Sequence, residues 1–351
     1  MKAILISSPP TFELVDIPVP RCNSGYVLVR TDSCGVCGTD LEILRGSMAN
    51  GFVRYPLIPG HEWTGVVEEV GRDVRNVHVG DRVSVEGCLS CGICAHCRAS
   101  EVCLCESHEQ IGLTHNGGFA EFVTAPASLC HRVPDNVSLE EAVMVEPAAT
   151  VVRGIERARI RPGARVAIIG CGPIGQITAR VLSLHVPTMI LGIDVSETQR
   201  SMAVRAGMTE FVTTQNHEEL RQLSDGEGWD VVVNCATGST PLELAFAIAR
   251  RGASIVIFGT APDEHRFNIS ANRLVMGDLQ VEGVLGYTSQ SWESTLRLLA
   301  TRELKFHDLI THRVPLADFG RAIQLVERKT EPMGKVVVSY NGAAGSPAPR
   351  R

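Results

Sequence analysis

Short runs of alternating hydrophobic and polar residues, divided by turn residues, fill the first part of the chain. Examples are YVLVRT, TGVVEEVG, DRVSVEG and FAEFVTAP, which are separated by Gly, Pro and Asp. Runs of this length and alternation are typical of β-strands. We therefore expect residues 1–150 to form a β-rich unit, built as a barrel or a sandwich.

The pattern changes near residue 151. From ARVAIIGCGPIG onwards, apolar strand-like runs alternate with helical segments, in the order RVAIIG, MILGID, EFVTT, DVVVNCA, SIVIFG and LQVEGVLG. This alternation predicts βαβ units and a parallel sheet with helices on both faces over residues 151–286. After residue 286, a helix-like SWESTLRLLATREL and a strand-like KVVVSY lie within the remaining residues, 287–351.

Composition narrows the classes of function. The 351 residues are 44% hydrophobic and 21% charged, with a net charge of −6 and no basic run. A chain without a basic surface is a poor match to a phosphate backbone, so we expect no nucleic-acid partner. No stretch reaches the ~18 apolar residues of a membrane span, and the N-terminal segment lacks the long apolar core of a signal peptide. We expect a two-domain protein of the cytoplasm that does not bind membranes.

A glycine-rich turn follows the run RVAIIG and opens a helical segment. Its residues are Gly170, Gly172, Pro173, Ile174 and Gly175, which fit the pattern GxGxxG. In a turn between a strand and a helix, the first glycine allows the tight bend, the second allows close approach of a pyrophosphate, and the third lets the helix pack on the sheet. The bound phosphate then lies at the positive end of the helix. We therefore predict a dinucleotide site here.

Asp194 selects the type of dinucleotide. It ends the second strand of this unit, 19 residues beyond Gly175, where a carboxylate accepts hydrogen bonds from a ribose 2′-hydroxyl and repels a 2′-phosphate. The alternative role for Asp194 is to cap the following helix, which Ser196 can also do. Arg200 lies close enough in sequence to contact the cofactor, and a cation there would favour NADP. On balance the pattern predicts NAD.

Six of the twelve cysteines fall within residues 88–105, and reducing compartments disfavour disulfides. The spacing of Cys91, Cys94, Cys97 and Cys105 suits a closed tetrahedral zinc site that stabilises a lobe. An iron–sulfur cluster is the competing interpretation, but the ferredoxin spacing ends in a Cys-Pro that is missing. A zinc knuckle for nucleic acid fits poorly without basic neighbours. Cys88 and Cys103 are left over, and either can be confused with a ligand.

A second group of donors suggests a catalytic metal. The adjacent His61 and Glu62 follow Pro-Gly, where a polar turn before a strand is the alternative explanation. Cys37 upstream and Glu146 in an apolar setting downstream provide the further ligands that a catalytic zinc with an open position requires. Such a zinc lowers the pKa of a bound alcohol and so promotes hydride loss to a nicotinamide. Which of the two glutamates is the direct ligand stays open.

Thr39 and Asp40, which follow Cys37 closely, have candidate roles of their own. Thr39 is placed to take the proton of the alcohol and pass it outward. Asp40 is placed to orient His61 through the second ring nitrogen of the imidazole.

Taken together, these motifs resemble the zinc-containing medium-chain dehydrogenase/reductase superfamily, which includes alcohol, sorbitol, threonine and glucose dehydrogenases. The resemblance runs in order through CGVCGTD, PGHEWTGVVEEVG, VGDRV, the four-cysteine lobe, GFAEFV, VEP and the glycine turn. It implies an α/β fold in which a GroES-like, β-rich catalytic domain, formed by residues 1–150 and 287–351, carries an inserted Rossmann domain of residues 151–286. It also implies NAD, two zinc ions per subunit and a homo-oligomer, either a dimer or a tetramer.

Several positions place the chain within this superfamily. The motif VEP with Glu146 looks like the polyol and sugar dehydrogenase branch. Glu42 stands where many relatives carry a proton-relay histidine, and Cys88 stands where threonine dehydrogenases have a histidine. Lys335 is expected either to reach the cofactor phosphates or to begin a solvated strand. Some segments also resemble 2-deoxy-scyllo-inosamine dehydrogenases.

The leading hypothesis is zinc-dependent transfer of hydride between NAD and a secondary hydroxyl of a polyol, cyclitol or sugar, such as 2-deoxy-scyllo-inosamine or sorbitol. The alternative within enzymes is a threonine or simple alcohol dehydrogenase. The alternative of another class is a catalytically silent relative that binds a dinucleotide. The complete set of candidate catalytic residues argues against the last of these.

Overall fold

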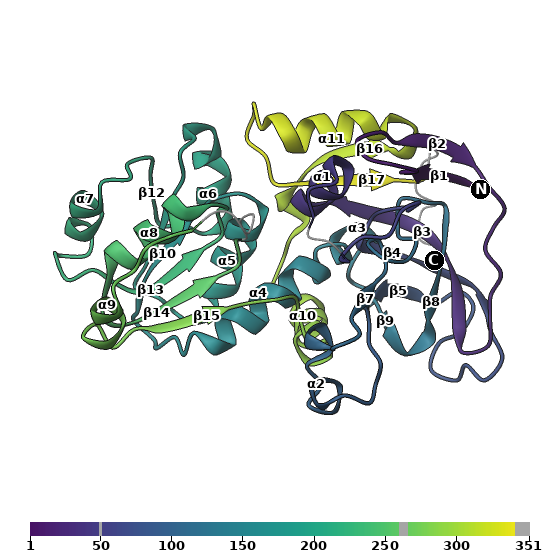
Figure 1. Cartoon of the computed structure of the whole chain (residues 1–351), viewed down its shortest axis with the longest axis horizontal. Coiled ribbons are helices and arrows are strands. Elements are labelled where there is room, and N and C mark those ends of the chain that lie inside the picture. Colours follow the sequence, from purple (N-terminus) through teal and green to yellow (C-terminus); the bar gives the residue numbers. More distant parts are fainter. Residues whose placement is uncertain (49–50, 260–265, 341–351) are drawn as a thin grey trace.

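The computed structural model describes residues 1–48, 51–259 and 266–340, and these form two lobes that lie side by side (Figure 1). One lobe contains the middle of the chain, drawn in teal and green. The other combines the beginning of the chain, in purple and blue, with its yellow end. Residues 341–351, which we assigned to the catalytic domain, lie outside the described residues.

The first lobe is built on a parallel sheet with the strand order β12-β11-β10-β13-β14-β15. Its strands are β10 (Arg165–Ile169), β11 (Met189–Ile193), β12 (Glu210–Val212), β13 (Trp229–Asn234), β14 (Ala249–Ile257) and β15 (Gln280–Gly283). The chain starts in the middle with β10, builds one half outwards and then returns to build the other half. This is the doubly wound Rossmann order, and in such sheets ligands bind at the carboxyl ends of the two strands where the order reverses, here β10 and β13.

Helices cover both faces of this sheet. They are α4 (Val145–Arg157), α5 (Pro173–Ser183), α6 (Arg200–Ala206), α7 (His217–Gln222), α8 (Ser239–Ile248) and α9 (Ala271–Val275). Successive residues of a strand point to opposite faces, and in β10 Ile168 packs in one buried cluster with Ile177 of α5, whereas Ile169 packs in another with Leu244 of α8. Both faces therefore need apolar residues, which explains the uninterrupted hydrophobic runs of this region.

The second lobe contains a largely antiparallel sheet with the order β16-β17-β3-β4-β5-β9, and β8 also pairs with β3. Its strands are β3 (Tyr26–Val36), β4 (Glu62–Val70), β5 (Arg82–Val85), β8 (Phe122–Pro126), β9 (Cys130–Arg132), β16 (Ile310–Pro315) and β17 (Lys335–Ser339). Because β17 pairs directly with β3, the two ends of the chain share one sheet. With the parallel sheet, this confirms the predicted α/β fold, in which a Rossmann unit is inserted in a β-rich domain.

The remaining elements complete the second lobe and its edges. They are β1 (Lys2–Leu5), β2 (Glu13–Asp16), α1 (Gly38–Arg45), β6 (Cys88–Leu89), α2 (Ala95–Arg98), η1 (Val102–Leu104), β7 (Glu109–Gln110), η2 (Ala127–Leu129), α3 (Leu139–Ala142), η3 (Glu197–Gln199, in the first lobe), α10 (Ser289–Ala300), η4 (His307–Leu309), η5 (Leu316–Asp318) and α11 (Phe319–Arg328). Among the described residues, no helix is long and apolar enough to span a membrane.

Helix α4 connects the two lobes. It contacts β4 of the second lobe as well as α5 and β15 of the first. The domain boundary that we placed after residue 150 therefore falls inside a continuous buried helix. A single apolar helix serves both cores here, so the sequence pattern shows no break at the point where the chain passes between them.

Candidate metal centres and nucleotide site

Strand pairing brings the residues of the first metal site together. Strands β3 and β4 are antiparallel, with Gly35 opposite Glu62, so Cys37 at the end of β3 lies near His61 at the start of β4. The donor atoms of Cys37, His61 and Glu62 all lie within 4.8 Å of one another. The turn before His61 requires glycine, because Gly60 has φ +100° and an added Cβ would lie 2.8 Å from the backbone nitrogen of Phe119.

Asp40 and Thr39 lie on the first turn of α1, which begins directly after Cys37. The backbone N–H of Cys37 donates to Asp40 Oδ2 at 2.8 Å, which fixes the carboxylate at the start of the helix. Asp40 Oδ1 then lies 3.7 Å from His61 Nδ1, and Thr39 Oγ1 lies 3.8 Å from Cys37 Sγ. Glu42 is half-buried one turn further along the helix. Thr39 and Asp40 thus lie beside Cys37 and His61.

This donor set fits a cation. His61 is 5% exposed, and both its Nδ1 and Asp40 Oδ1 are buried without a hydrogen-bond partner among the described residues. Burial disfavours a charged imidazole, yet Asp40, Cys37 and Glu146 raise the pKa of His61 well above its ordinary value. The surroundings therefore favour positive charge at this point, which a zinc ion would supply. Cysteine sulfur, imidazole nitrogen and carboxylate oxygen are all ligands that zinc takes.

Lys335 lies in this site, which contradicts the prediction that it contacts the cofactor phosphates or begins a solvated strand. Its Nζ is 2.5 Å from Glu62 Oε2 and 2.7 Å from Oε1, and the two residues are 2% and 1% exposed. Lys335 begins β17, and the next residue, Val336, pairs with Val36 of β3. The side chain of Lys335 is therefore directed towards Glu62 in the metal site. Although burial lowers it, the pKa of Lys335 is raised by Glu62.

Glu146 is half-buried in the first turn of α4. Burial raises the pKa of Glu146 to about 7, and the charge of Glu62 adds to this effect, whereas His61 and Lys335 oppose it. Glu146 is not among the donors that lie within 4.8 Å of one another, in contrast to Glu62. Glu62, however, is already bound to Lys335. Glu62 thus lies among the closest donors but is paired with Lys335, whereas Glu146 lies outside that group. These differences bear on which glutamate is the direct metal ligand.

The four predicted cysteine ligands converge in the lobe around α2. Cys91, Cys94, Cys97 and Cys105 have sulfur atoms within 4.8 Å of one another. The Sγ atoms of Cys94 and Cys97 are 3.5 Å apart, and the backbone N–H groups of Cys91 and Cys94 donate to Cys105 Sγ and Cys91 Sγ at 3.3 and 3.4 Å. Backbone N–H groups from Cys97 and Glu106 lower the pKa of Cys94 to about 6. Four converging sulfurs, with the thiolate of Cys94 stabilised by the backbone, fit a structural zinc.

The glycine turn has the geometry of a phosphate-binding site. Gly170 has φ +93°, a conformation that favours glycine, and α5 begins at Pro173 with Gly172 as its N-cap. An added Cβ on Gly175 would lie 2.0 Å from the carbonyl oxygen of Gly170, so the helix packs closely on the turn. An added Cβ on Gly172 would meet nothing within 4 Å. The helix N-terminus, which Ile174 continues, is therefore open to a ligand.

Asp194 lies beside this turn, at the carboxyl end of β11. Its oxygens accept hydrogen bonds from the backbone N–H groups of Cys171 at 2.8 Å and Ser196 at 2.9 Å. The carboxylate is therefore held next to the glycine turn, where a ribose would bind. Arg200 is engaged elsewhere, since its guanidinium binds Glu197 and lies 4.8 Å from the ring centre of Phe211.

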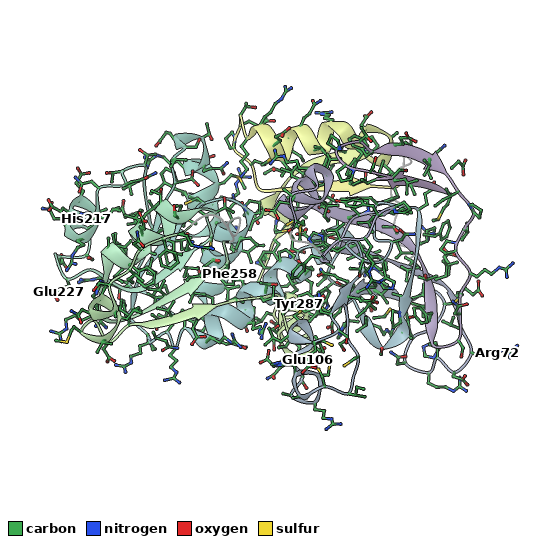
Figure 2. All side chains as sticks on the ribbon, in the orientation of Figure 1. Arg72, Glu106, His217, Glu227, Phe258 and Tyr287 are labelled. Atoms are coloured by element: carbon green, nitrogen blue, oxygen red, sulfur yellow. The ribbon has the colours of Figure 1, made fainter. Side chains whose placement is uncertain are left out.

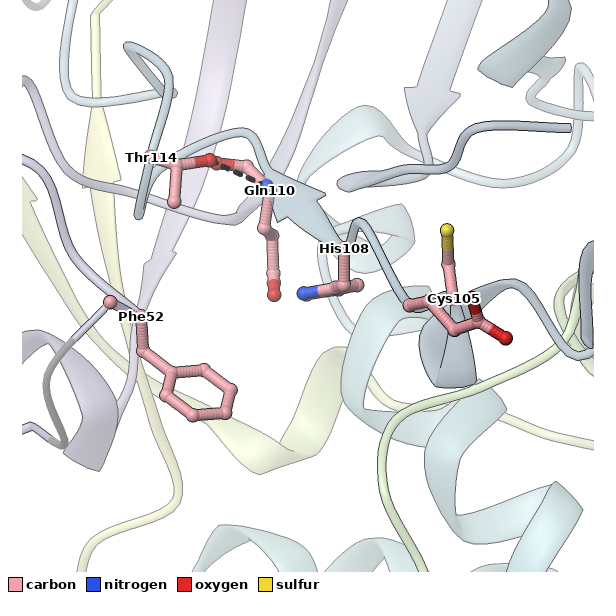
Figure 3. Close-up of a pocket in the computed structure, with 7 residues that line it drawn as sticks. Phe52, Cys105, His108, Gln110 and Thr114 are labelled. Carbon is pink, nitrogen blue, oxygen red and sulfur yellow. Dashed lines mark hydrogen bonds between the residues drawn. The ribbon is translucent and has the colours of Figure 1, made fainter. Parts of the chain in front are cut away.

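A recess of about 320 Å³ has neither a donor of the first metal site nor a residue of the glycine turn in its lining (Figure 3). It is lined by Gly51, Phe52, Cys105, Glu106, His108, Gln110 and Thr114. Figure 3 shows Phe52 on one side and His108 and Cys105, from the cysteine lobe, on the other. Burial lowers the pKa of His108. Since none of the catalytic donors lines it, we assign the chemistry to the donor set and not to this recess.

The arrangement has a definite chemical capacity. A zinc ion held by Cys37, His61 and a glutamate would polarise an alcohol, and a nicotinamide held by the Rossmann unit would accept its hydride. Asp40, 3.7 Å from the ring of His61, would orient the imidazole, and Thr39, 3.8 Å from Cys37 Sγ, would be available for the alcohol proton. Sequence reasoning missed Lys335 as a member of this site. The available signal was a lysine directly before the apolar run VVVS, which is unusual for a strand in the middle of a sheet.

Known proteins share these features along the chain. Residues 23–135 match the alcohol dehydrogenase GroES-like domain family, and residues 173–301 match the zinc-binding dehydrogenase family. L-Threonine 3-dehydrogenase of Bacillus licheniformis is 30% identical over 348 residues, 96% of this chain and 98% of that protein. Sorbitol dehydrogenase of Arabidopsis thaliana is 32% identical over 315 residues, 86% of this chain and 85% of that protein.

A solved structure shares the whole architecture. The crystal structure of a zinc-binding dehydrogenase from Sinorhizobium meliloti, bound to NADP, has a TM-score of 0.89 and 27% sequence identity, and the match covers 96% of this chain and 98% of that one. Both domain families, relatives matched over nearly their full length and a common fold therefore show that the chain belongs to the zinc-containing medium-chain dehydrogenase/reductase superfamily and is an oxidoreductase of the alcohol dehydrogenase type.

Proposed function

We propose that this enzyme oxidises a secondary hydroxyl of a polyol, cyclitol or sugar, with zinc as the catalytic metal and NAD⁺ as the hydride acceptor. The observation that carries the proposal is the buried donor set of Cys37, His61 and Glu62, which Glu146 supplements with a second carboxylate. The four-cysteine lobe already accounts for a structural zinc, so we assign this second donor set to a catalytic zinc.

The proposed roles follow from the contacts. Cys37 and His61 hold the zinc, and Asp40 orients His61 from 3.7 Å. Glu62 is held by Lys335, so it serves as an intermittent ligand, while Glu146 contacts the metal directly or through water. Thr39, 3.8 Å from the sulfur of Cys37, takes the alcohol proton. This division also explains why one of two neighbouring carboxylates has a lysine partner.

The cofactor preference rests on Asp194. Its carboxylate lies beside the glycine turn and would repel a 2′-phosphate. Arg200 does not offset this charge, because Glu197 neutralises it within the same segment. We therefore propose NAD, although the relative from Sinorhizobium meliloti was crystallised with NADP.

A threonine dehydrogenase is the second candidate, because the Bacillus licheniformis relative bears that name. Two sequence features favour the polyol class instead. One is the VEP motif with Glu146, and the other is Cys88, which stands where threonine dehydrogenases have a histidine. In this structure Cys88 is 3% exposed and is in contact with Cys103, so it is not available as a substrate contact.

Two further properties complete the proposal. We expect two zinc ions per subunit, one in each donor set, which metal analysis of the purified protein measures. We also expect a dimer or tetramer, because β15 is the edge strand of its sheet and exposes Val281, which is 39% accessible, while Leu285, two residues beyond the strand, is 57% accessible. An exposed apolar edge strand is a surface for pairing with another chain. Light scattering after gel filtration tests the oligomer.

The deciding experiment is the initial rate of NADH formation with NAD⁺, and in parallel with NADP⁺, across a substrate panel. The panel contains myo- and scyllo-inositol, scyllo-inosamine, 2-deoxy-scyllo-inosamine, sorbitol, glucose, threonine and simple alcohols. Turnover restricted to cyclitols or polyols supports the proposal, whereas preference for threonine or ethanol contradicts it.

Two variants separate an enzyme from a silent dinucleotide-binding relative. Cys37→Ser removes a ligand of the proposed catalytic zinc and should abolish turnover while NADH binding, followed by fluorescence, stays nearly unchanged. Cys22→Ser, on a half-exposed cysteine outside both donor sets, is the matched control and should keep full activity. Unchanged turnover in Cys37→Ser would refute the catalytic assignment.

A further inference from the structure

A second, separate contact between cysteines lies at the base of the zinc lobe. The Sγ atoms of Cys88 and Cys103 are 2.7 Å apart, and the two residues are 3% and 5% exposed. For comparison, the Sγ atoms of Cys91 and Cys97 within the four-cysteine cluster are 3.9 Å apart. The closest sulfur pair among these residues is therefore not part of the zinc cluster, and the dehydrogenase reaction does not use it.

In sequence, the two cysteines lie near the two ends of the segment that forms the lobe. Cys88 begins β6, where the chain enters the lobe, and Cys103 lies in η1, shortly before the chain leaves it. The segment between them contains three of the four zinc ligands and excludes only Cys105. A bond between Cys88 and Cys103 would therefore close the lobe at its base.

The return segment from the Rossmann domain holds Cys88 in place. The hydroxyl oxygen of Tyr287 accepts hydrogen bonds from the backbone N–H groups of Gly87 at 2.6 Å and Cys88 at 3.2 Å. Figure 2 shows Tyr287 at the junction between the two lobes of the molecule. On the neighbouring residue Gly286, an added Cβ would lie 2.7 Å from Cys103 Sγ, so Cys103 packs against the same segment.

A buried arginine fixes the other side. Arg153 of α4 forms an ion pair with Glu101, two residues before Cys103, and donates to the carbonyl oxygen of Leu285 at 2.6 Å. The same return segment is thereby bound to both ends of the lobe. Hydrogen bonds and an ion pair that do not involve sulfur therefore hold the segments that carry both cysteines.

We propose that Cys88 and Cys103 are a redox-active thiol pair that a hydroperoxide oxidises to a reversible disulfide. A disulfide requires a sulfur–sulfur distance of about 2.05 Å. From 2.7 Å, the sulfurs need to approach by only roughly 0.7 Å. The cysteines of the cluster would have to move further and would lose their zinc.

The chemistry balances without a further reactant. One of the two thiols loses its proton, and its sulfur attacks a peroxide oxygen, which breaks the O–O bond, forms a sulfenic acid and releases water or an alcohol. The second thiol then attacks the sulfenic sulfur, which forms the S–S bond and releases water. The two sulfurs lose two electrons in total, and the peroxide gains them. A dithiol reductant reverses the reaction by thiol–disulfide exchange.

The disulfide would change how firmly the lobe retains zinc. Structural zinc binding is coupled to folding of the segment that carries its ligands. Closing residues 88–103 into a loop restricts that segment in the zinc-free state, which disfavours metal loss. We therefore expect the oxidised protein to release its lobe zinc to a chelator several-fold more slowly than the reduced protein does.

The test starts from zinc-loaded protein that has been fully reduced and freed of reductant. Graded hydrogen peroxide is added, and thiols are counted under denaturing conditions while zinc is measured in the same samples. Non-reducing peptide mapping with fragment sequencing identifies the linked cysteines. The expected result is that two thiols disappear first, that zinc content stays constant, that Cys88 is linked to Cys103, and that dithiothreitol restores both thiols.

Variants separate this pair from the other thiols. Cys88→Ser and Cys103→Ser should each prevent the link and abolish the change in zinc release, whereas Cys130→Ser, a buried cysteine elsewhere in the same domain, should behave like the wild type. Zinc loss that parallels the first two thiols, or a first link that involves a cluster cysteine, overturns the proposal. The wild-type mapping gives this answer even if a variant fails to fold.

Discussion

The ion pair between Lys335 and Glu62 provides the sharpest test of the site's structure. Both residues are nearly inaccessible, and the nitrogen lies 2.5 Å from a carboxylate oxygen. Lys335→Met keeps the length of the side chain but leaves the Glu62 carboxylate buried without its partner. Removing one member of a buried pair costs about 3–5 kcal/mol. The lower end applies here, about 3 kcal/mol, because a zinc bound to the same donor set partly compensates the carboxylate.

This free energy converts into a measurable change in melting temperature. In a domain of roughly 200 residues, each kcal/mol shifts Tm by about 2–4 °C, so Lys335→Met should lower the Tm of the catalytic domain by about 6–12 °C. Calorimetry of the zinc-loaded enzyme measures this shift. Lys305→Met, at an exposed lysine of the same domain, is the control and should change stability by less than about 0.5 kcal/mol.

A double variant decides whether the loss comes from the pair. Glu62→Gln removes the other charge, and the combination with Lys335→Met leaves no buried charge without a partner. The loss in the double variant should be smaller than the sum of the single losses by more than about 1 kcal/mol. Strict additivity, or a shift for Lys335→Met no larger than that of the Lys305 control, would refute the buried pairing.

Three further predictions concern the cofactor, the lobe and pH. Asp194→Ala should lower kcat/KM with NAD⁺ by about tenfold or more in initial-rate assays, because a charge-assisted hydrogen bond contributes about 1.5–3 kcal/mol. It should also raise the ratio of kcat/KM with NADP⁺ to kcat/KM with NAD⁺. An unchanged ratio would contradict the role of Asp194. Cys94→Ser should reduce the zinc content from two to one per subunit by metal analysis, while Cys22→Ser retains both. Burial raises the pKa of Glu146 to about 7 from about 4.5. In the zinc-stripped protein, the proton bound to Glu146 therefore stabilises the fold fully below pH 4.5, and this stabilisation is lost as the pH rises through 7. Glu146→Gln should remove this pH dependence of Tm, and an identical pH profile in the variant would exclude the raised pKa.

Much of the fold follows from local sequence because the Rossmann strands carry their own signals. RVAIIG and DVVVNCA are continuous apolar runs, as expected for strands that are buried on both faces, and they form β10 and β13. The glycine turn is equally local, since its strand, bend and helix are contiguous. The donor residues Cys37 and His61 were also readable, because each belongs to a short motif whose residue types suit a metal.

Pairings between distant segments are a different case. Lys335 and Glu62 are 273 residues apart in sequence, and they meet only because β17 and β4 both pair with β3. A one-residue change of register would have turned Lys335 to the opposite face of the sheet, and no local pattern determines that register. The same applies to Cys88 and Cys103, whose contact depends on Tyr287 and Gly286 returning from another domain. Short motifs therefore identify the ligands, whereas long-range strand register and domain contacts determine which charges and thiols surround them.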